Sequence, residues 1–431
     1  MTTATTSPGA TAPAVHTDAQ LLERSWKVPI GLGVFALVAI ILFVVLGRDG
    51  QSVFSFTASN ANAVQLPTLP LGARATGIVV SVIAVLMAAG AAVLVQRRVH
   101  VPLWYVAIYT LTLVIGFLVW TTTGNTLHIT GLLVGSLALS APLIFGALGG
   151  VISERVGVTN VAIEGQLLAG AFVSAVTASV TGSLVAGVIA AMVAGVLVSF
   201  VLGAFAVKYA VNQVIVGIVL NVLVLGLTTF LYQTVLVNNQ TTLNTPPRFH
   251  NIDIPLLSQI PVIGPLLFSQ TVIVYLMYIA VIAIFVGLFR TRWGLRLRAV
   301  GEHPQAADTV GINVARTRFW NVALAGAIVG LGGAYFTLGS VGPFSQNMTN
   351  GNGFIALAAV IFGRWDPIRA TLAALLFGFA SNLQSVISIL GSPVPNDFLL
   401  MLPYVVTIFA VAGVVGRVRG PAAAGRPYVK S

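Results

Sequence analysis

RTRWGLRLRAVGEHPQAADTVGINVARTR, residues Arg290–Arg318, carries six arginines in 29 residues and lies between two long apolar runs. Pro304 suits a first helical turn, where its missing N–H would be unpaired anyway. Gly311 suits a helix end, where a left-handed residue closes the last carbonyls. A short helix of small residues in a basic loop is typical of a cytoplasmic docking site on a membrane protein. The stretch therefore predicts a membrane-embedded chain whose energy source lies in a partner subunit.

The composition of the chain excludes a soluble globular protein. Of its 431 residues, 57% are hydrophobic and only 7% are charged, whereas soluble domains carry roughly 25% charged residues. In a bilayer the backbone must satisfy its own hydrogen bonds, which favours helices. We therefore predict an all-α, polytopic transmembrane helical bundle. The absence of cysteine excludes a disulfide framework and a cysteine-based metal site.

Apolar runs of about 20 residues indicate the membrane-spanning helices. The candidates are residues 30–47, 75–95, 102–122, 130–150, 162–181, 184–207, 214–236, 272–290, 319–340, 351–363, 368–390 and 399–416. The run at 351–363 is too short to span a bilayer alone, so we predict a half-helix or a bent hairpin with 368–390. The sequence therefore predicts about 10–12 spans.

The distribution of positive charge predicts the orientation of the chain. With the N-terminus inside and the spans alternating, all of the 21 lysines and arginines except Arg48, Arg74 and Arg248 fall in cytoplasmic loops and tails. The reverse orientation would violate the positive-inside rule, so both termini are predicted to be cytoplasmic. The net charge of +11 then reflects topology and contact with anionic membrane lipids, rather than binding to nucleic acid.

Composition also divides the chain into segments. Residues 1–28 are predicted to form a disordered cytoplasmic tail. Residues 29–122 hold three leading spans, and residues 123–416 form the main transmembrane domain with its coupling loop at 290–318. Residues 417–431 are predicted to be a cytoplasmic C-terminal tail.

The segment 237–270 does not fit a membrane span. It is polar in its first part and amphipathic afterwards, and it contains five prolines. Because proline interrupts helices, we predict that this segment lies on the outer face, where an external partner would contact it.

The run at 184–207 carries small residues at every fourth position. They are Gly187, Ala191, Gly195, Ser199 and Gly203. Residues four apart share a helix face, so this ladder predicts the close approach of two backbones. Gly326, Gly330 and Ala334 repeat the pattern in the run at 319–340. Two interpretations are open: a face that slides during transport, and tight packing alone.

Two short stretches resemble each other within the chain. GVTNVAIEG (Gly157–Gly165) and GNGFIALAA (Gly351–Ala359) both precede apolar helices. Transporters often contain duplicated halves that meet at the substrate path. An internal duplication and a chance similarity are the two interpretations.

No pattern for ATP binding or catalysis is present. None of the three lysines, Lys27, Lys208 and Lys430, follows the Gly-rich loop of a Walker A motif. The ten acidic residues are scattered, and HExxH and GxSxG motifs are absent. We therefore predict that the chain is not an enzyme and binds neither a cofactor nor a metal ion itself.

Polar residues inside the apolar runs are the candidates for a substrate pathway. Glu164 lies near the start of its run, one turn beyond Asn160, and an ionisable group at membrane depth is a functional candidate. The alternative is structural pairing of Glu164, near the cytoplasmic boundary, with Arg155 or a neighbouring loop arginine. Asn221, Asn382 and Gln384 carry amides, which suit the hydroxyls and ring nitrogens of a neutral solute; the alternative role for these amides is hydrogen bonding between helices.

The scarcity of charge in the spans also bears on mechanism. Proton- or sodium-coupled carriers usually need acidic relays within the membrane, and only Glu164 is available. This favours a channel-like or externally powered carrier. The alternative from another functional class is a self-sufficient secondary transporter.

Four blocks carry a resemblance to a known family. They are ERVGVTNVAIEGQLLAGAF (Glu154–Phe172), NQVIVGIVLNVLVLGLTTFL (Asn212–Leu231), GLRLRAVGEHPQAADTVGINV (Gly294–Val314) and GNGFIALAAVIFGRWDP (Gly351–Pro367). In this order and spacing, the chain from about 130 to 416 resembles the inner-membrane permease subunits of bacterial ABC importers for simple sugars and nucleosides, relatives of the ribose and branched-chain amino acid permeases.

The resemblance implies a division of labour among several subunits in a bacterial plasma membrane. Two permeases, either two homologues or two copies, would form the pore. Cytoplasmic subunits would bind ATP and dock on the loop, where Glu302, Ala306, Ala307 and Gly311 match the family's coupling motif. An external lipoprotein would deliver a nucleoside or sugar for transport by alternating access. A permease for branched-chain amino acids is the alternative substrate class.

Overall fold

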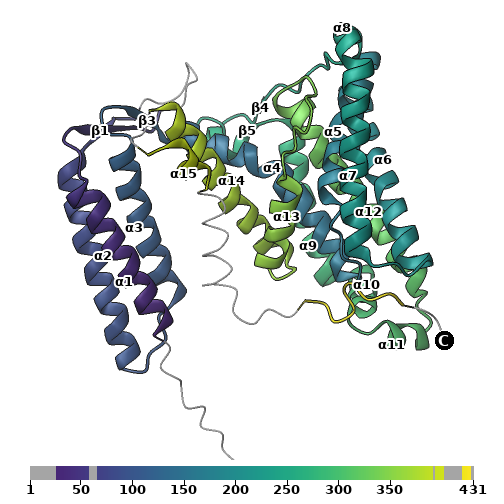
Figure 1. Ribbon diagram of the computed structural model, residues 1–431, viewed down its shortest axis with the longest axis horizontal. Helices are drawn as coiled ribbons and strands as arrows, with labels where there is room; N and C mark the ends of the chain where they lie inside the picture. The colour runs from purple at the N-terminus through teal and green to yellow at the C-terminus, as the bar shows by residue number, and fades with distance from the viewer. Residues whose placement is uncertain (1–25, 58–65, 392–393, 402–419, 429–431) are drawn as a thin grey trace, which may run out of the picture. The chain divides into compact units, whose positions relative to one another are not determined.

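The computed structural model describes residues 26–57, 66–391, 394–401 and 420–428 (Figure 1). Within these residues ten helices are long and apolar enough to cross a membrane. The predicted all-α polytopic bundle is therefore confirmed. The predicted span at 399–416 after Met401, most of the N-terminal tail and the end of the C-terminal tail lie outside the described residues.

The leading helices form a compact unit of their own, which comprises residues 26–49 and 72–120. Its helices are α1 (Lys27–Ile40), which continues as a π-helical turn over Ile41–Val45, α2 (Ala73–Gln96) and α3 (Leu103–Thr121). Tyr109 is buried among apolar residues of α1 and α2, and its hydroxyl donates a hydrogen bond of 2.6 Å to the carbonyl of Leu32. This bond joins the first helix of the unit to the third.

The second unit contains the rest of the described chain. A small sheet of order β2-β1-β3 is built from β1 (Gln51–Ser55), β2 (Leu69–Gly72) and β3 (Thr126–His128). The long helices that follow are α4 (Ile129–Arg155), α5 (Ile163–Thr181), α6 (Leu184–Gly203), α7 (Gln213–Leu231), α9 (Val272–Arg290), α12 (Val314–Ala334) and α14 (Pro367–Ile389).

Shorter elements connect these helices. They are α8 (Gln240–Leu243), β4 (Ile252–Asp253), β5 (Ser269–Gln270), α10 (Arg292–Glu302), α11 (Pro304–Thr309), α13 (Asn352–Phe362) and α15 (Asn396–Leu400). Four π-helical turns, at Ala204–Lys208, Tyr232–Leu236, Gly264–Phe268 and Tyr335–Ser340, and a 3-10 turn at Val237–Asn239 complete the described elements.

Helix α4 is the centre of the second unit. Every one of its residues from Ser140 to Glu154 is buried, as expected for a helix that is apolar on all sides. Helices α12, α13 and α14 pack against it. The core of the unit is therefore built around α4, and the elements that surround it hold the candidate site.

The small-residue ladder brings α6 and α12 into backbone contact. A Cβ atom added at Gly195 would lie 2.0 Å from the carbonyl oxygen of Gly326, and one added at Gly330 would lie 2.2 Å from that of Ala191. Real Cβ atoms do not approach this closely, so glycine is required at both positions. The ladder therefore serves tight packing in this structure.

The short run at 351–363 is a half-helix, as predicted. Helix α13 has 11 residues and is therefore only about 16 Å long. The carbonyl of Trp365, just after α13, accepts a hydrogen bond of 2.9 Å from Nε of Arg155, where α4 ends. The segment from Ser340 to Phe362 therefore returns the chain to the end of the bundle at which α4 ends and α12 begins.

Candidate functional site

The chain turns back into the bundle after α4. Gly157 has a φ of +90° and starts a loop that leads to the first residue of α5, Ile163. Ile163 lies beside Gly146 and Gly150 of α4, so α5 begins beside the second half of α4 rather than at its last residue. Asn160 lies in the loop rather than on the helix, and its predicted place one helical turn before Glu164 was wrong.

The carboxylate of Glu164 binds the N-terminus of the half-helix α13. It accepts hydrogen bonds from the hydroxyl of Thr349 at 2.6 Å, from the backbone N–H of Gly351 at 2.8 Å and from that of Gly353 at 2.6 Å. A negative charge at this position is stabilised because helix N-termini carry partial positive charge. The side chain is only 8% exposed.

The alternative pairing of Glu164 with Arg155 does not occur. Nε of Arg155 donates to the carbonyl of Trp365 instead. Glu164 also follows Ile163, which lies beside Gly146 and Gly150 rather than at Arg155, because the loop after α4 carries the chain back into the bundle.

Asn221 caps the N-terminus of α5, because the residue just before α5 has no side chain that could do so. The residue before α5, Ala162, has no side-chain hydrogen bond to the helix. From α7, Oδ1 of Asn221 accepts from the N–H of Gly165, and its Nδ2 donates to the carbonyl of Val161, both at 2.8 Å. The helix-to-helix interpretation of Asn221 is therefore the one that the structure supports.

Asn160 joins a second short network. Its Nδ2 donates to Oε1 of Gln166 at 3.1 Å, and Nε2 of Gln166 donates to the hydroxyl of Ser199 on α6 at 2.9 Å. All three side chains are buried. Sequence reasoning missed Gln166 as a site residue, although an amide in the apolar run 162–181 was a signal for it.

These residues form one group, which we call the Glu164 cluster. Its members are Asn160, Glu164, Gln166, Ser199, Asn221 and Thr349. The cluster joins α5, α6, α7 and the start of α13 near the middle of the bundle. Its polar groups bind one another and the backbone, so its direct chemical effect is to fix helix ends.

Asn382 and Gln384 lie apart from the cluster, on α14. Nδ2 of Asn382 donates to the carbonyl of Leu132, near the start of α4, at 2.7 Å. Gln384 is half-buried. The structure therefore brings three of the five predicted pathway residues together and places the other two toward the opposite end of α4 from Arg155.

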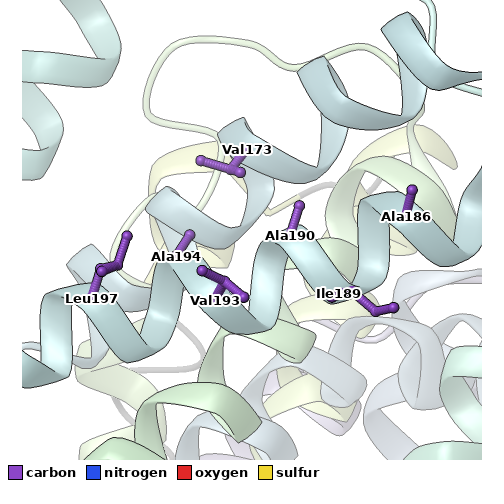
Figure 2. Close-up of a pocket in the computed structure, with 7 residues that line it drawn as sticks. All are labelled: Val173, Ala186, Ile189, Ala190, Val193, Ala194 and Leu197. Carbon is purple, nitrogen blue, oxygen red and sulfur yellow. The ribbon is translucent and has the colours of Figure 1, made fainter.

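The groove shown in Figure 2 lies along α5 and α6. It is lined by Val173 of α5 and by Ala186, Ile189, Ala190, Val193, Ala194 and Leu197 of α6. All of these side chains are hydrocarbon. A small-molecule site needs a few placed polar groups to fix orientation, so this groove suits lipid chains or an apolar helix better than a polar solute.

The basic loop contains the short helix that its sequence predicts. Pro304 begins α11, and Gly311 has a φ of +85°. Ala306 is exposed, whereas Ala307 is 3% exposed and packs into the core. Ala307 therefore does not face a partner as predicted, because it lies on the side of α11 that packs against the core.

A C-terminal segment, residues 420–428, packs against the coupling loop. The N–H of Ala423 donates to the carbonyl of Gly301 at 2.9 Å, and that of Ala422 donates to the carboxylate of Glu302 at 3.2 Å. The buried guanidinium of Arg318, 1% exposed, donates to the carbonyl of Arg426 at 3.0 Å. We call this segment the C-terminal strap. The sequence did not indicate these contacts.

Comparison with known proteins agrees with this architecture. Residues 132–411 match the family described as branched-chain amino acid transport system / permease component. The chain belongs to this permease family. The match covers the Glu164 cluster, the coupling loop and the half-helix, and it begins after the leading helices. The permease is therefore a transport component of an ABC transporter, and the alternative of a self-sufficient secondary carrier is wrong.

Individual relatives are similar over nearly their whole length. The permease is 41% identical over 306 residues to a guanosine ABC transporter permease protein of Bacillus subtilis, covering 68% of this chain and 95% of that one. It is 41% identical over 317 residues to a nucleoside ABC transporter permease protein of Lactococcus lactis, covering 71% and 98%. A putative glucose ABC transporter permease protein of Haloferax volcanii is 34% identical over 258 residues, covering 59% and 77%. No solved structure matches the chain.

Family membership fixes several properties of the permease. It is a multi-pass protein of the bacterial inner membrane, as its apolar helices require. ABC permeases use the ATP that their partner subunits hydrolyse. The predictions of family, localisation and non-enzymatic role are thereby confirmed.

Proposed function

We propose that the permease forms part of the membrane pore of an importer that carries nucleosides into the cell. The observation that carries this proposal is its 41% identity to two permeases named for guanosine and nucleosides, over 95% and 98% of their lengths. Simple sugars are the second candidate class, because a relative named for glucose is 34% identical.

The distribution of buried charge supports a neutral solute. The buried charged side chains of the described residues are Glu154, Glu164 and Arg318. Glu154 accepts a hydrogen bond from the indole of Trp365, and the other two bind backbone groups as described above. Among the described residues, both buried carboxylates already accept hydrogen bonds, and the buried guanidinium of Arg318 lies against the C-terminal strap rather than at the Glu164 cluster. This arrangement argues against branched-chain amino acids as substrates.

We assign different roles to the predicted pathway residues. Asn160, Glu164 and Asn221 hold the helix ends that border the pathway. Asn382 joins α14 to α4. Gln384 is the best candidate for direct solute contact, because it is half-buried and its amide has no hydrogen bond to any of the described residues. The pathway itself would lie between this permease and a homologous permease or a second copy.

The coupling loop provides a route for energy from ATP. We propose that the cytoplasmic ATP-binding subunit contacts the outward side of α11, where Ala306 and Val310 are exposed, with Glu302 and Gly311 at its two ends. Gly301 packs directly on the carbonyl of Arg155. A displacement of α11 would therefore move the end of α4 and the loop that leads to Glu164. An external lipoprotein would supply the substrate on the other side.

Substrate competition tests the proposed substrate class. Cells that express the complete importer should take up radiolabelled guanosine, and excess unlabelled nucleosides should compete with it, whereas leucine should not. Uptake that is blocked by glucose or ribose and not by nucleosides would assign the sugar class instead. A strain that lacks only the permease gives the background.

Substitution on α11 tests the docking surface. Ala306→Trp should abolish ATP-driven uptake while leaving thermal stability unchanged, because this exposed side chain would block the partner without disturbing the core. The adjacent Ala307→Trp should instead destabilise the fold by about 1–3 kcal/mol through overpacking. Co-purification of the ATP-binding subunit and thermal unfolding in detergent distinguish the two effects. Full uptake by the stable Ala306→Trp variant would contradict docking at α11.

A further inference from the structure

An outer hairpin, residues 252–270, is fixed to the first turn of α9. Ile252 and Asp253 pair with Gln270 and Ser269 in a two-stranded antiparallel ladder. The hydroxyl of Tyr275 on α9 donates to the carbonyl of Ile252 at 2.9 Å. The hairpin therefore cannot move far from the end of α9.

The length of α9 sets the depth of this hairpin. The helix has 19 residues, so it is about 28 Å long, and the hydrocarbon core of a bilayer is about 30 Å thick. Arg290 ends the helix on the side of the coupling loop. A helix of this length reaches the opposite boundary only at its first turn, which places the hairpin at the surface of the outer leaflet.

The hairpin exposes hydrocarbon at this boundary. Between Ile254 and Gln270 it contains no charged residue, and Leu256 is 80% exposed. Further exposed apolar side chains of the hairpin are Ile252, Leu257, Ile260, Ile263 and Leu267. Such a concentration of exposed apolar residues marks an interaction surface rather than ordinary solvent contact.

The backbone is bent to present this surface. Leu256 and Val262 have φ values of +68° and +64°, which are rare for bulky and β-branched residues. In each case the next N–H bonds back to the proline before it, from Leu257 to Pro255 at 2.9 Å and from Ile263 to Pro261. These are γ-turns, which are strained when φ is positive. The fold thus tolerates local strain while Leu256 points away from the core.

We propose that the outer hairpin is an interfacial anchor that inserts its apolar side chains, Leu256 foremost, into the outer leaflet of the membrane. Two observations favour lipid over a soluble protein partner. The hairpin is fixed to α9, a helix long and apolar enough to span the membrane, and this helix also exposes the apolar residues Ile279 and Ile282. The exposed charged and polar side chains of the hairpin, Asp253 and Gln259, are also outnumbered by its six exposed apolar ones, whereas a protein interface is surrounded by a polar rim.

The absence of native cysteine allows a direct test. Leu256→Cys is labelled with an environment-sensitive NBD fluorophore, and the permease is reconstituted into nanodiscs of phosphatidylcholine and phosphatidylglycerol. Emission should shift to the blue, and doxyl-labelled lipid should quench it more strongly than aqueous iodide. Because the side chain is 80% exposed, the substitution leaves the core intact.

Thr242→Cys on α8 provides the matched control. The continuous helical stretch from Gln213 to Leu243 has 31 residues and is therefore about 46 Å long, so its tip extends beyond the hydrocarbon core. Figure 1 shows α8 at this far tip. Iodide should quench the label at 242 and lipid should not.

Three results would overturn the anchor. One is a label at 256 that iodide quenches as strongly as the label at 242. Another is a label at 256 that becomes shielded only when the external binding subunit is added, which would make the hairpin a protein-docking surface. The third concerns a second labelled variant, Ile260→Cys. The anchor requires both residues to enter the leaflet, so it would be overturned if iodide quenched the label at 260 while lipid quenched the label at 256.

Discussion

Replacing Glu164 with alanine should destabilise the permease by about 3–5 kcal/mol and abolish transport. The substitution leaves the hydroxyl of Thr349 and the N–H groups of Gly351 and Gly353 without their acceptor, and each buried unsatisfied donor costs about 1–3 kcal/mol. The half-helix α13 also loses the charge that stabilises its N-terminus. Thermal unfolding in detergent and substrate uptake measure the two effects.

Glu164→Gln is the matched control for this prediction. It keeps the size of the side chain and one carbonyl oxygen, so it should be destabilised less than the alanine variant. Thr349→Val removes only the hydroxyl donor and should be milder still. If Glu164→Ala unfolded at the temperature of the parent protein, the carboxylate would not hold α13 as the geometry indicates.

The second large effect is expected at the contact between α6 and α12. In Gly195→Leu the new Cβ atom would lie 2.0 Å from the carbonyl oxygen of Gly326, and neither backbone has room to yield. The two helices must separate, which should lower the free energy of unfolding by about 3 kcal/mol or more. Most of the permease should then fail to fold. Size-exclusion chromatography of a fluorescent fusion in detergent measures the folded fraction.

Gly226→Leu is the control for this substitution. Gly226 is also a glycine within a long apolar helix, α7, but a Cβ atom there would meet nothing within 4 Å. Its replacement should leave the folded fraction of the isolated permease unchanged. Equal losses at both positions would show that helix propensity or insertion, rather than the α6–α12 contact, limits folding.

Local signals in the sequence predicted the long elements well. The apolar run at 272–290 coincides with α9, Val272–Arg290, because a membrane span is defined by its own composition. Pro304 and Gly311 predicted the position of α11, because both residues act through their own backbone geometry. Neither feature depends on distant parts of the chain.

The environment of Glu164 could not be predicted in this way. Its hydroxyl donor, Thr349, lies 185 residues away in sequence, and a hydrogen bond across that separation leaves no periodic pattern. The loop from Gly157 to Ala162 is mostly apolar, so it could not be distinguished from a helical span by composition. The orientation of Ala307 likewise depends on the core beneath α11, which the sequence alone does not display.

The internal similarity between Gly157–Gly165 and Gly351–Ala359 has a structural counterpart. The first stretch is mostly the loop that leads into α5, whereas the second, apart from Gly351, lies within α13; both helices begin inside the bundle. The two beginnings meet at Glu164. Interrupted helices of this kind are typical of duplicated transporters, and an internal duplication stays a prediction.

The C-terminal strap has a consequence for biosynthesis. Glu302 leaves the ribosome 120 residues before its strap partner, Ala422, and the segments of a nascent chain fold in the order in which they are made. The coupling loop is therefore made before its strap, and it would lack these contacts while the later helices are still being inserted. The coupling loop gains its contacts with the strap only after residues 420–428 have been synthesised. An ATP-binding subunit that binds the loop together with its strap would therefore select permeases that contain the strap over truncated ones.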